Sequence, residues 1–362
     1  MKQIGAFAGR SYRPKKMKKI GFALLFVTML GCLASASAQL TGYGVDLDEP
    51  VAAGGQASGE LAELNEAINR LQRARAFETT ALQKEVDDLR IELRSSGQLK
   101  FTKITYPSTD GLMIPAYLFE PLASGRYPAI VEVHGGQHGS VSSRSLARIT
   151  AWVQSGYVVL APDYRGSSGY TEDYYATADY GGREIDDMLA AVDYLEALPS
   201  VLPGRAGIIG ASHGGYNALM AVIRYPDRFR VAVDLFGPTD LVYRLTAKPE
   251  ENANTDSGDV AYFAKMVGHT IDEAPELYRQ RSPRFLAERI KVPLLILHGD
   301  KDQVVDVKES LWLVEALQQA GNKQFQYVIL EGANHGWPAE LWQPGYARAK
   351  AFLDKYLRQH DP

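Results

Sequence analysis

The sequence of 362 residues has one cysteine, Cys32, and a formal net charge of only −4. A single cysteine can supply neither a disulfide framework within the chain nor a cysteine-based metal site. The small net charge provides no basic field of the kind that nucleic-acid binding needs, so we expect no nucleic-acid partner. At 46% hydrophobic and 23% charged residues, the chain has the composition of an ordinary globular protein with a large core.

Patterns for common cofactors are also missing. The sequence has no phosphate-binding loop, no H-E-x-x-H zinc pattern and no dinucleotide-binding fingerprint, so we expect neither a cofactor nor a metal. Long hydrophobic runs are missing as well. The apolar stretch 20–33 is too short for a comfortable membrane span, and we expect no transmembrane segment.

The N-terminal residues have the pattern of an export signal. Met17-Lys18-Lys19 is a charged start before the apolar stretch, and Ala36-Ser37-Ala38 is an A-x-A cleavage site. We predict that residues 1–38 are a signal peptide, that the residues before Met17 are a mis-assigned start, and that the protein is exported to the periplasm or the cell exterior. The alternative is a lipid anchor on Cys32, because residues 29–32 also fit a lipobox.

Two segments precede the main domain. Residues 39–59 are rich in glycine, alanine and acidic residues, which is typical of a flexible linker. Residues 60–98 are predicted to be a helical extension, because apolar residues recur there at spacings of three and four: Leu61, Leu64, Ile68, Leu71, Leu82, Val86, Leu89 and Leu93. A helix or helical hairpin packed on the main domain is favoured. A coiled-coil arm that joins two copies is the alternative, although Arg75 and Glu78 interrupt its apolar seam.

Residues 99–362 alternate between strand and helix patterns. This alternation predicts an α/β fold with a mainly parallel central sheet flanked by helices. A hairpin is expected around Asp110-Gly111, formed by strands 101–106 and 113–119. Further strands are expected at 129–134, 157–161, 231–236, 293–297 and 325–330, and helices at 143–155, 180–198, 311–320 and 347–357.

The strongest motif is G-x-S-x-G at Gly210–Gly214, with Ser212 at its centre. An apolar strand pattern ends at Gly210, and the helix-forming run 216–225 follows directly. A serine on a strained strand-to-helix turn is exposed to substrate, and only glycines two residues to either side leave room for that turn. We therefore predict that Ser212 is a nucleophile.

A serine hydroxyl needs a base, and that base needs an orienting carboxylate. The strand at 293–297 runs into a loop that contains Asp302, and the strand at 325–330 runs into one that contains His335. We predict Asp302 as the acid and His335 as the base. Asp300 is the alternative acid, whereas His298 is expected to be a core or turn residue.

The oxyanion of an acyl-transfer intermediate needs backbone N–H donors. We expect one from His213, whose side chain should point away from the reaction, and another from Gly136 in a glycine-containing loop after strand 129–134. The segment 246–281 is a candidate lid. Candidates for a substrate wall are Tyr262, Phe263 and Trp337.

Together these pieces resemble the catalytic domain of the prolyl oligopeptidase family of serine peptidases, which has the α/β-hydrolase fold. The matching segments follow one another from residue 99 to the C-terminus, at 134–136, 163–170, 181–187, 210–215, 275–283, 298–302 and 334–336. The resemblance implies Asp302 rather than Asp300 as the acid, and hydrolysis through an acyl-serine intermediate.

The sequence departs from that family in two respects. The residues before 99 contain no β-propeller blade repeats, and Val304 stands where many relatives have an arginine or asparagine that holds a substrate carbonyl. No Glu-Glu signature for a free amino end is identifiable either. We predict a serine peptidase that cleaves peptide or small amide substrates. A carboxylesterase for acyl or carbohydrate esters is the alternative, and a non-catalytic binding module on the same scaffold is less favoured.

Overall fold

The computed structural model describes residues 59–247, 257–337 and 339–358. The predicted signal peptide, Cys32 and the predicted linker up to residue 58 lie outside the described residues. Within the described part of the chain, no helix combines the length and the apolar character needed to cross a bilayer.

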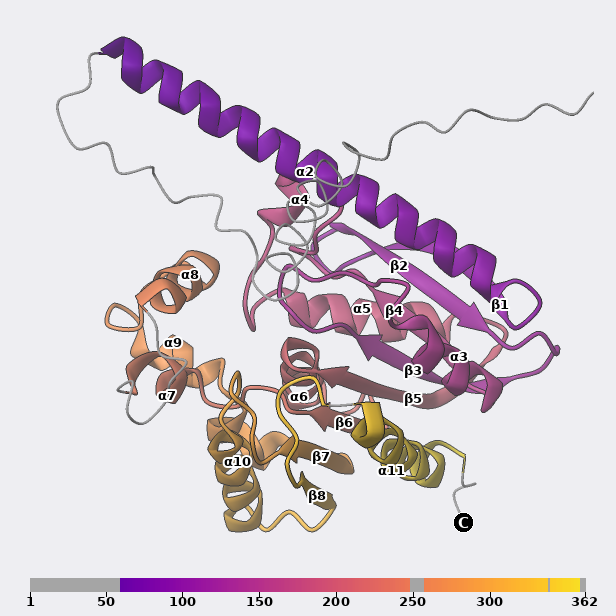
Figure 1. The fold of residues 1–362 in the computed structure, drawn as a ribbon. Coiled ribbons are helices and arrows are strands. Elements are labelled where there is room, and N and C mark those ends of the chain that lie inside the picture. The colour runs from indigo at the N-terminus through magenta and orange to yellow at the C-terminus, as the bar shows by residue number, and fades with distance from the viewer. Residues whose placement is uncertain (1–58, 248–256, 338, 359–362) are drawn as a thin grey trace, which may run out of the picture. The chain divides into compact units, whose positions relative to one another are not determined.

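An eight-stranded sheet runs through the domain in the order β1-β2-β4-β3-β5-β6-β7-β8 (Figure 1). Strands β1 and β2 form the predicted antiparallel hairpin, β2 pairs antiparallel with β4, and all other pairs are parallel. The predicted mainly parallel sheet is therefore confirmed. The strands are β1 (Lys100–Pro107), β2 (Met113–Glu120), β3 (Tyr127–Val133), β4 (Val158–Pro162), β5 (Val201–Ala211), β6 (Val231–Leu235), β7 (Leu294–Gly299) and β8 (Phe325–Leu330).

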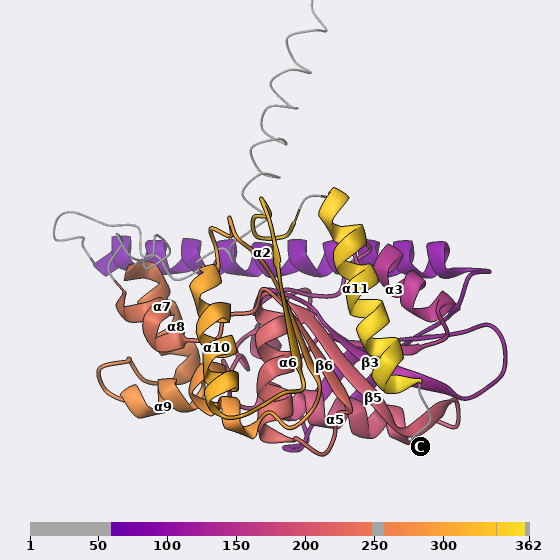
Figure 2. The same ribbon diagram turned by 90° about the horizontal axis from the view of Figure 1, so that it is seen from below.

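Helices cover both faces of the sheet, and a separate hydrophobic cluster fills each side. One side carries α5 (Glu184–Glu196), α6 (His213–Arg224), the 3₁₀ helix η1 (Pro283–Arg289) and α10 (Val307–Gln319). The other side carries α3 (Leu146–Gln154) and α11 (Ala339–Leu357), which Figure 2 shows across the strands from α6. The predicted flanking helices are thus confirmed as well.

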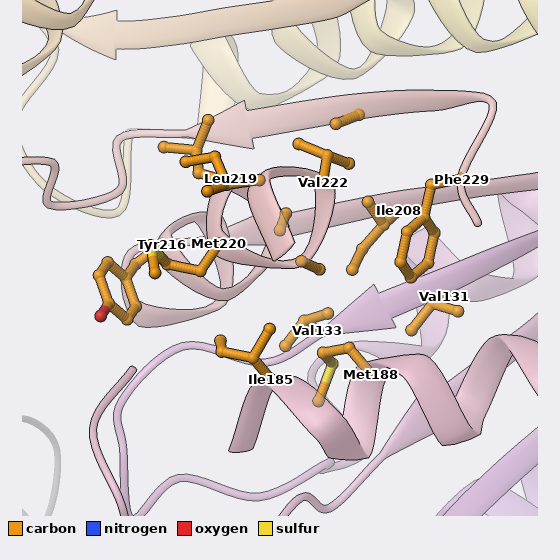
Figure 3. Packing of buried hydrophobic residues seen from close by; sticks show 14 of the residues in the cluster. Val131, Val133, Ile185, Met188, Ile208, Tyr216, Leu219, Met220, Val222 and Phe229 are labelled. Atoms are coloured by element: carbon orange, nitrogen blue, oxygen red, sulfur yellow. The ribbon is translucent and has the colours of Figure 1, made fainter. Parts of the chain in front are cut away.

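Helix α6 lies at the centre of the larger cluster. Its side chains Leu219, Met220 and Val222 pack among residues of β3, β5 and α5, as Figure 3 shows. All eleven residues from His213 to Ile223 are buried, so the helix contacts protein on every side. A helix enclosed in this way cannot shift without opening the core, and it therefore holds the residue before it, Ser212, in a fixed place.

Three short helices lie in the region of the predicted lid, α7 (Leu241–Thr246), α8 (Ser257–Val267) and α9 (Pro275–Gln280), and a fourth, α4 (Glu172–Tyr175), follows β4. Phe263, Met266 and Tyr278 of this region are buried in the larger core cluster. The described part of the segment is therefore packed on the domain, and its action as a lid stays a prediction.

The predicted helical extension forms one helix, α2 (Gly59–Ser95), rather than a hairpin. It packs on the domain through Lys84, Ile91 and Ser95, which are buried. The predicted apolar stripe lies on the opposite side: Leu71 is 71% exposed and Leu93 is 78% exposed. The helix thus contacts its own domain, but not through the face that the apolar spacing marks.

Candidate active site

Ser212 occupies a sharp turn between β5 and α6. Its backbone has φ 56° and ψ −124°, a conformation that costs a non-glycine residue about 1–3 kcal/mol. The flanking glycines permit it, because a β-carbon at Gly210 would overlap the carbonyl of Gly214, and one at Gly214 would overlap that of Val133. Because α6 and β5 are both fixed in the core, the strain is maintained and the hydroxyl is held at the sheet edge.

The three side chains predicted to act together are within hydrogen-bonding distance of one another. His335 Nε2 lies 3.0 Å from Ser212 Oγ, and His335 Nδ1 lies 2.8 and 3.1 Å from the two carboxylate oxygens of Asp302. Because a carboxylate only accepts, Nδ1 carries the proton and Nε2 is free to accept from the serine hydroxyl. The ring is thereby held in the tautomer that a general base requires.

The side chain of Asp302 is buried beneath this pair. Burial by itself raises the pKa of its carboxyl, but hydrogen bonds with His298 and His335 and from the backbone of Val305 outweigh it, and the pKa lies well below its usual range. The N–H groups of Val304 and Val305 both donate to Oδ1, at 2.8 and 2.9 Å. Asp302 is therefore an anion held in one orientation.

The alternative acid, Asp300, has a different environment. Its Oδ1 accepts from the backbone N–H of Gly332 at 2.6 Å, which links the loop after β7 to the loop after β8. Asn334 joins the same two loops, since its side-chain oxygen accepts from the N–H groups of Gln303 and His335. Both residues thus hold together the loops that carry Asp302 and His335.

His298, which the sequence analysis placed in the core or a turn without a role in the site, lies against the carboxylate of Asp302. It is fully buried, and its Nε2 lies 3.0 Å from the carbonyl of Val305 and 3.4 Å from Asp302 Oδ2. On its other side, Nδ1 lies 2.7 Å from Ser310 Oγ. Its position four residues before Asp302, at the end of a strand, was the available signal.

A cluster of aromatic side chains packs against one side of the His335 imidazole through Phe236. Phe236, which follows β6 with a φ of 47°, meets the His335 ring edge to face at 4.9 Å, and Trp337 packs on Phe236 at 5.0 Å. Trp337 is itself buried and lies against Trp342. The wall candidate Trp337 therefore supports the imidazole through Phe236, whose role the sequence analysis missed.

The two predicted oxyanion donors belong to segments that meet at Ser212, and their action as donors stays a prediction. The imidazole of His213 points away to Glu184 Oε2, 3.0 Å from Nε2, as predicted, which leaves its backbone N–H at the start of α6. Gly135 packs against the elbow, since a β-carbon there would lie 3.4 Å from the Ser212 β-carbon, and Gly136 follows with a φ of 71°. The glycine loop and the serine turn are thus adjacent.

The sequence profile of the prolyl oligopeptidase family matches residues 142–360. The chain belongs to the prolyl oligopeptidase family. A second profile, that of acetyl xylan esterase, matches residues 74–184.

Relatives in this family differ in length from the present chain. The uncharacterized peptidase YuxL of Bacillus subtilis is 29% identical, over 71% of this chain and 39% of its own. The uncharacterized peptidase YtmA of the same species is 30% identical, over 62% of this chain and 82% of its own. A solved structure of a puromycin-hydrolyzing peptidase of Mycobacterium tuberculosis is 28% identical with a TM-score of 0.64, and the match covers 72% of this chain and 39% of that one.

The match to the prolyl oligopeptidase family begins after the glycine loop, and α2 lies before it. Lys84 of α2 is nevertheless buried against that loop: Nζ lies 2.5 Å from Asp163 Oδ2 and donates to the carbonyl of Val141 at 2.6 Å. The N–H of Val141 donates in turn to Asp163 Oδ1, and Tyr170 OH to Oδ2. One buried ion pair therefore joins α2 to the segment that continues the glycine loop.

The two histidines of the glycine loop, His134 and His138, make contacts that support the fold. His134 is buried with Nε2 3.0 Å from Ser167 Oγ, and His138 lies 2.6 Å from the carbonyl of Gly166 and stacks on Tyr175. Burial lowers the pKa of both to about 4. They are therefore neutral at pH 7.

The other two candidates for a substrate wall, Tyr262 and Phe263, differ in how far they are buried. Tyr262 is 38% exposed and meets the ring of His138 edge to face, whereas Phe263 is buried against Tyr180. A place for Tyr262 in a substrate wall stays a prediction, whereas Phe263 fixes α8 to the core. In residues 59–247, 257–337 and 339–358, no three histidine, cysteine or acidic side chains gather as a metal site would require.

Proposed function

We propose that this member of the prolyl oligopeptidase family is a serine hydrolase that cleaves peptide and small amide bonds through an acyl-serine intermediate. The observation that carries the proposal is the continuous hydrogen-bonded series from Ser212 Oγ through His335 to Asp302. Its order, distances and protonation states are those that activate a serine hydroxyl.

In the first half of the reaction, Ser212 Oγ attacks the substrate carbonyl carbon while its proton passes to His335 Nε2. The buried carboxylate of Asp302 stabilises the imidazolium that forms. The carbonyl oxygen becomes an oxyanion, which the N–H groups of His213 and Gly136 receive. Loss of one such donor costs about 3–4 kcal/mol in enzymes of this type.

In the second half, His335 gives its proton to the departing amine, and the carbon–nitrogen bond breaks to leave an acyl ester on Ser212. Water then loses a proton to His335 and attacks the ester. The second intermediate collapses, the acid product leaves, and Ser212 regains its proton. Apart from the substrate and water, each step uses only groups of the chain.

An esterase is the second candidate. It is favoured by the acetyl xylan esterase match, which spans residues 74–184 and so includes the C-terminal part of α2, the hairpin and the glycine loop. The same machinery cleaves acyl or carbohydrate esters, because only the leaving group differs.

The test compares purified enzyme with the Ser212→Ala variant on acyl-peptide anilides, proline peptides and acyl esters, ranked by kcat/KM. We expect amide turnover, and a decrease in kcat of about 10⁶ in Ser212→Ala with unchanged folding. Amide turnover far below ester turnover would favour the esterase. Undiminished turnover in Ser212→Ala would exclude the mechanism, and a chain that a fluorophosphonate probe does not label would be a binding module.

We also propose that the protein is exported, on the strength of the charged start, the apolar stretch and Ala36-Ser37-Ala38. Mass spectrometry of the protein from its native host would then find an N-terminus at Gln39. A lipid-modified Cys32 at the N-terminus would support the anchor instead, and an unprocessed start would contradict export.

A further inference from the structure

Helix α2 has an exposed apolar stripe along most of its length. Among its residues 65–95, six apolar side chains are at least 41% exposed: Ile68, Leu71, Leu82, Val86, Leu89 and Leu93. At about 100° per residue, all six lie within about 40° of the direction of Leu82, and Arg75 and Glu78 lie in the same stripe. From Ile68 to Leu93 the stripe is about 38 Å long. So large an apolar surface on a helix is typical of an interaction site.

The opposite side of α2 is already occupied by the domain. Lys84 is bound to Asp163, Asp87 accepts from Ser143 Oγ at 2.7 Å, and Asp88 pairs with Tyr117 and Lys103. Phe77 meets Tyr175 of α4 edge to face. The stripe therefore cannot rotate inward without breaking a buried ion pair, and its partner must come from outside the domain.

The order of residues along the stripe is symmetric about the point between residues 76 and 77, except that Leu93 corresponds to Glu60. Leu71 and Leu82 lie at equal distances from the point between residues 76 and 77, and so do Arg75 and Glu78. Ile68 and Val86 are symmetric to within one residue, and Leu89 corresponds to position 64, where the sequence also has a leucine. The midpoint of the helix itself, Gly59–Ser95, is residue 77. A surface that is its own complement under a two-fold rotation is the mark of an isologous interface.

We propose that two copies of the chain pair through this stripe, with their α2 helices antiparallel and a two-fold axis between residues 76 and 77. Leu71 then packs on Leu82 of the partner subunit, and Ile68 packs near Val86 of the partner subunit. Arg75 meets Glu78 of the partner subunit, twice because of the symmetry. The two residues that interrupt the apolar seam in the sequence thus become its central ion pairs.

Charge decides the direction of the pair. In a parallel pair in register, Arg75 would face Arg75 of the partner subunit, and Glu78 would face Glu78 of the partner subunit, and both contacts are repulsive. The antiparallel pair also leaves room for both domains, since each lies on the far side of its own helix.

Cysteine cross-linking tests the arrangement in the full chain with Cys32→Ser. A variant with both Leu71→Cys and Leu82→Cys is expected to form a disulfide-linked dimer under mild oxidation, as seen on a non-reducing gel. Leu71→Cys alone is expected to form none, because the two copies of position 71 are about 16 Å apart along an antiparallel pair, which is too far for a disulfide. In a parallel pair in register, each position faces its own copy, so Leu71→Cys alone would cross-link as readily as the double variant. Cross-linking of Leu71→Cys alone would therefore overturn the proposal.

Charge reversal provides an independent test by sedimentation. Arg75→Glu or Glu78→Arg alone is expected to weaken the dimer at least tenfold, and the two together are expected to restore it. Leu122→Glu, at a leucine that lies outside α2 and is 51% exposed, is the matched control and should leave the mass unchanged. A wild-type chain that stays monomeric at about 100 µM, or that binds lipid vesicles without dimerising, would refute the pairing.

Discussion

Each residue that the proposed chemistry uses is held in place by neighbouring residues. Ser212 keeps its strained turn because glycines surround it, and His335 keeps its orientation because Asp302 and Phe236 bracket the ring. Asp302 is held in turn by two backbone N–H groups and by His298. Substitution of these supporting residues is therefore expected to lower activity, although they do not themselves react with the substrate.

The His298→Asn variant is expected to lower kcat about 10–100-fold while KM stays within a factor of two. The shorter side chain leaves Asp302 one hydrogen bond poorer, and positioning groups of this kind act on the transition state more than on substrate binding. Steady-state kinetics with an ester substrate measure the split, with His269→Gln at an exposed position as the control. A change in KM alone would contradict a role through Asp302.

Asp234 on β6 predicts a pH dependence of stability. It is fully buried, and burial raises the pKa of its carboxyl to about 7. In the unfolded chain the carboxyl has a pKa of about 3.9, so between pH 4 and 7 the folded state binds more protons and stability falls as pH rises. Asp302 has a lowered pKa, so its effect on the unfolding free energy changes only below about pH 4, outside this window.

Asp234→Asn removes this slope. The difference in unfolding free energy between Asp234→Asn and wild type is expected to be about 3 kcal/mol more in favour of the variant at pH 8 than at pH 5. Each pH unit over which the wild-type folded state holds the extra proton is worth about 1.4 kcal/mol. Urea unfolding at both pH values measures the gain, with Asp272→Asn at an exposed position as the control. Parallel curves for wild type and Asp234→Asn would show that Asp234 ionises normally.

At the scale of elements, α2 and the β5–α6 unit differ in how they serve the site. The β5–α6 unit places the serine because α6 is buried on all sides. Helix α2 is buried on one side only, and reaches the glycine loop through a single lysine whose side chain is 4% exposed. The sequence pattern marks the apolar side of α2 as the packing face, but a buried ion pair and several hydrogen bonds fix the other side to the domain.

Lys84→Met tests that link. Loss of the ammonium leaves the buried carboxylate of Asp163 unpaired, and we expect the unfolding free energy to fall by about 3–5 kcal/mol. Because Val141 bonds to both partners, the glycine loop should also shift, with kcat reduced by up to about a hundredfold. Lys103→Met removes the exposed pair with Asp88 and should cost below about 1 kcal/mol. Equal losses in the two variants would show that burial of the Lys84 pair has no special effect.

At the scale of the whole molecule, the chain combines the sheet of the prolyl oligopeptidase family with a long helix that presents a self-complementary stripe. If two copies associate, folding is linked to chain concentration. We expect the wild-type Tm to rise by several degrees between about 1 and 100 µM, since binding to the folded state stabilises it by mass action. Leu82→Glu should have a Tm that does not depend on concentration, and a wild-type Tm that also stays constant would contradict association.

Local signals in the sequence were enough for the strands, the hairpin and the three proposed catalytic residues. Strand periodicity, the glycines of G-x-S-x-G and polar loops after strands act over a few residues, so they are legible in one dimension. Element ends were less predictable. Helix α11 begins at Ala339 rather than 347, because packing of Leu341, Trp342 and Tyr346 on the core carries the helix through Pro344.

By itself, the sequence determined the α/β alternation, the strained serine turn and the order of serine, acid and base, because each is set by residue type and spacing. Tertiary structure alone decided that His298 supports Asp302, that Phe236 packs on His335, and that Lys84 rather than a leucine anchors α2. Those contacts join residues whose separation in the chain carries no periodic signal. Which side of an amphipathic helix faces its own domain depends on what the rest of the fold already buries there.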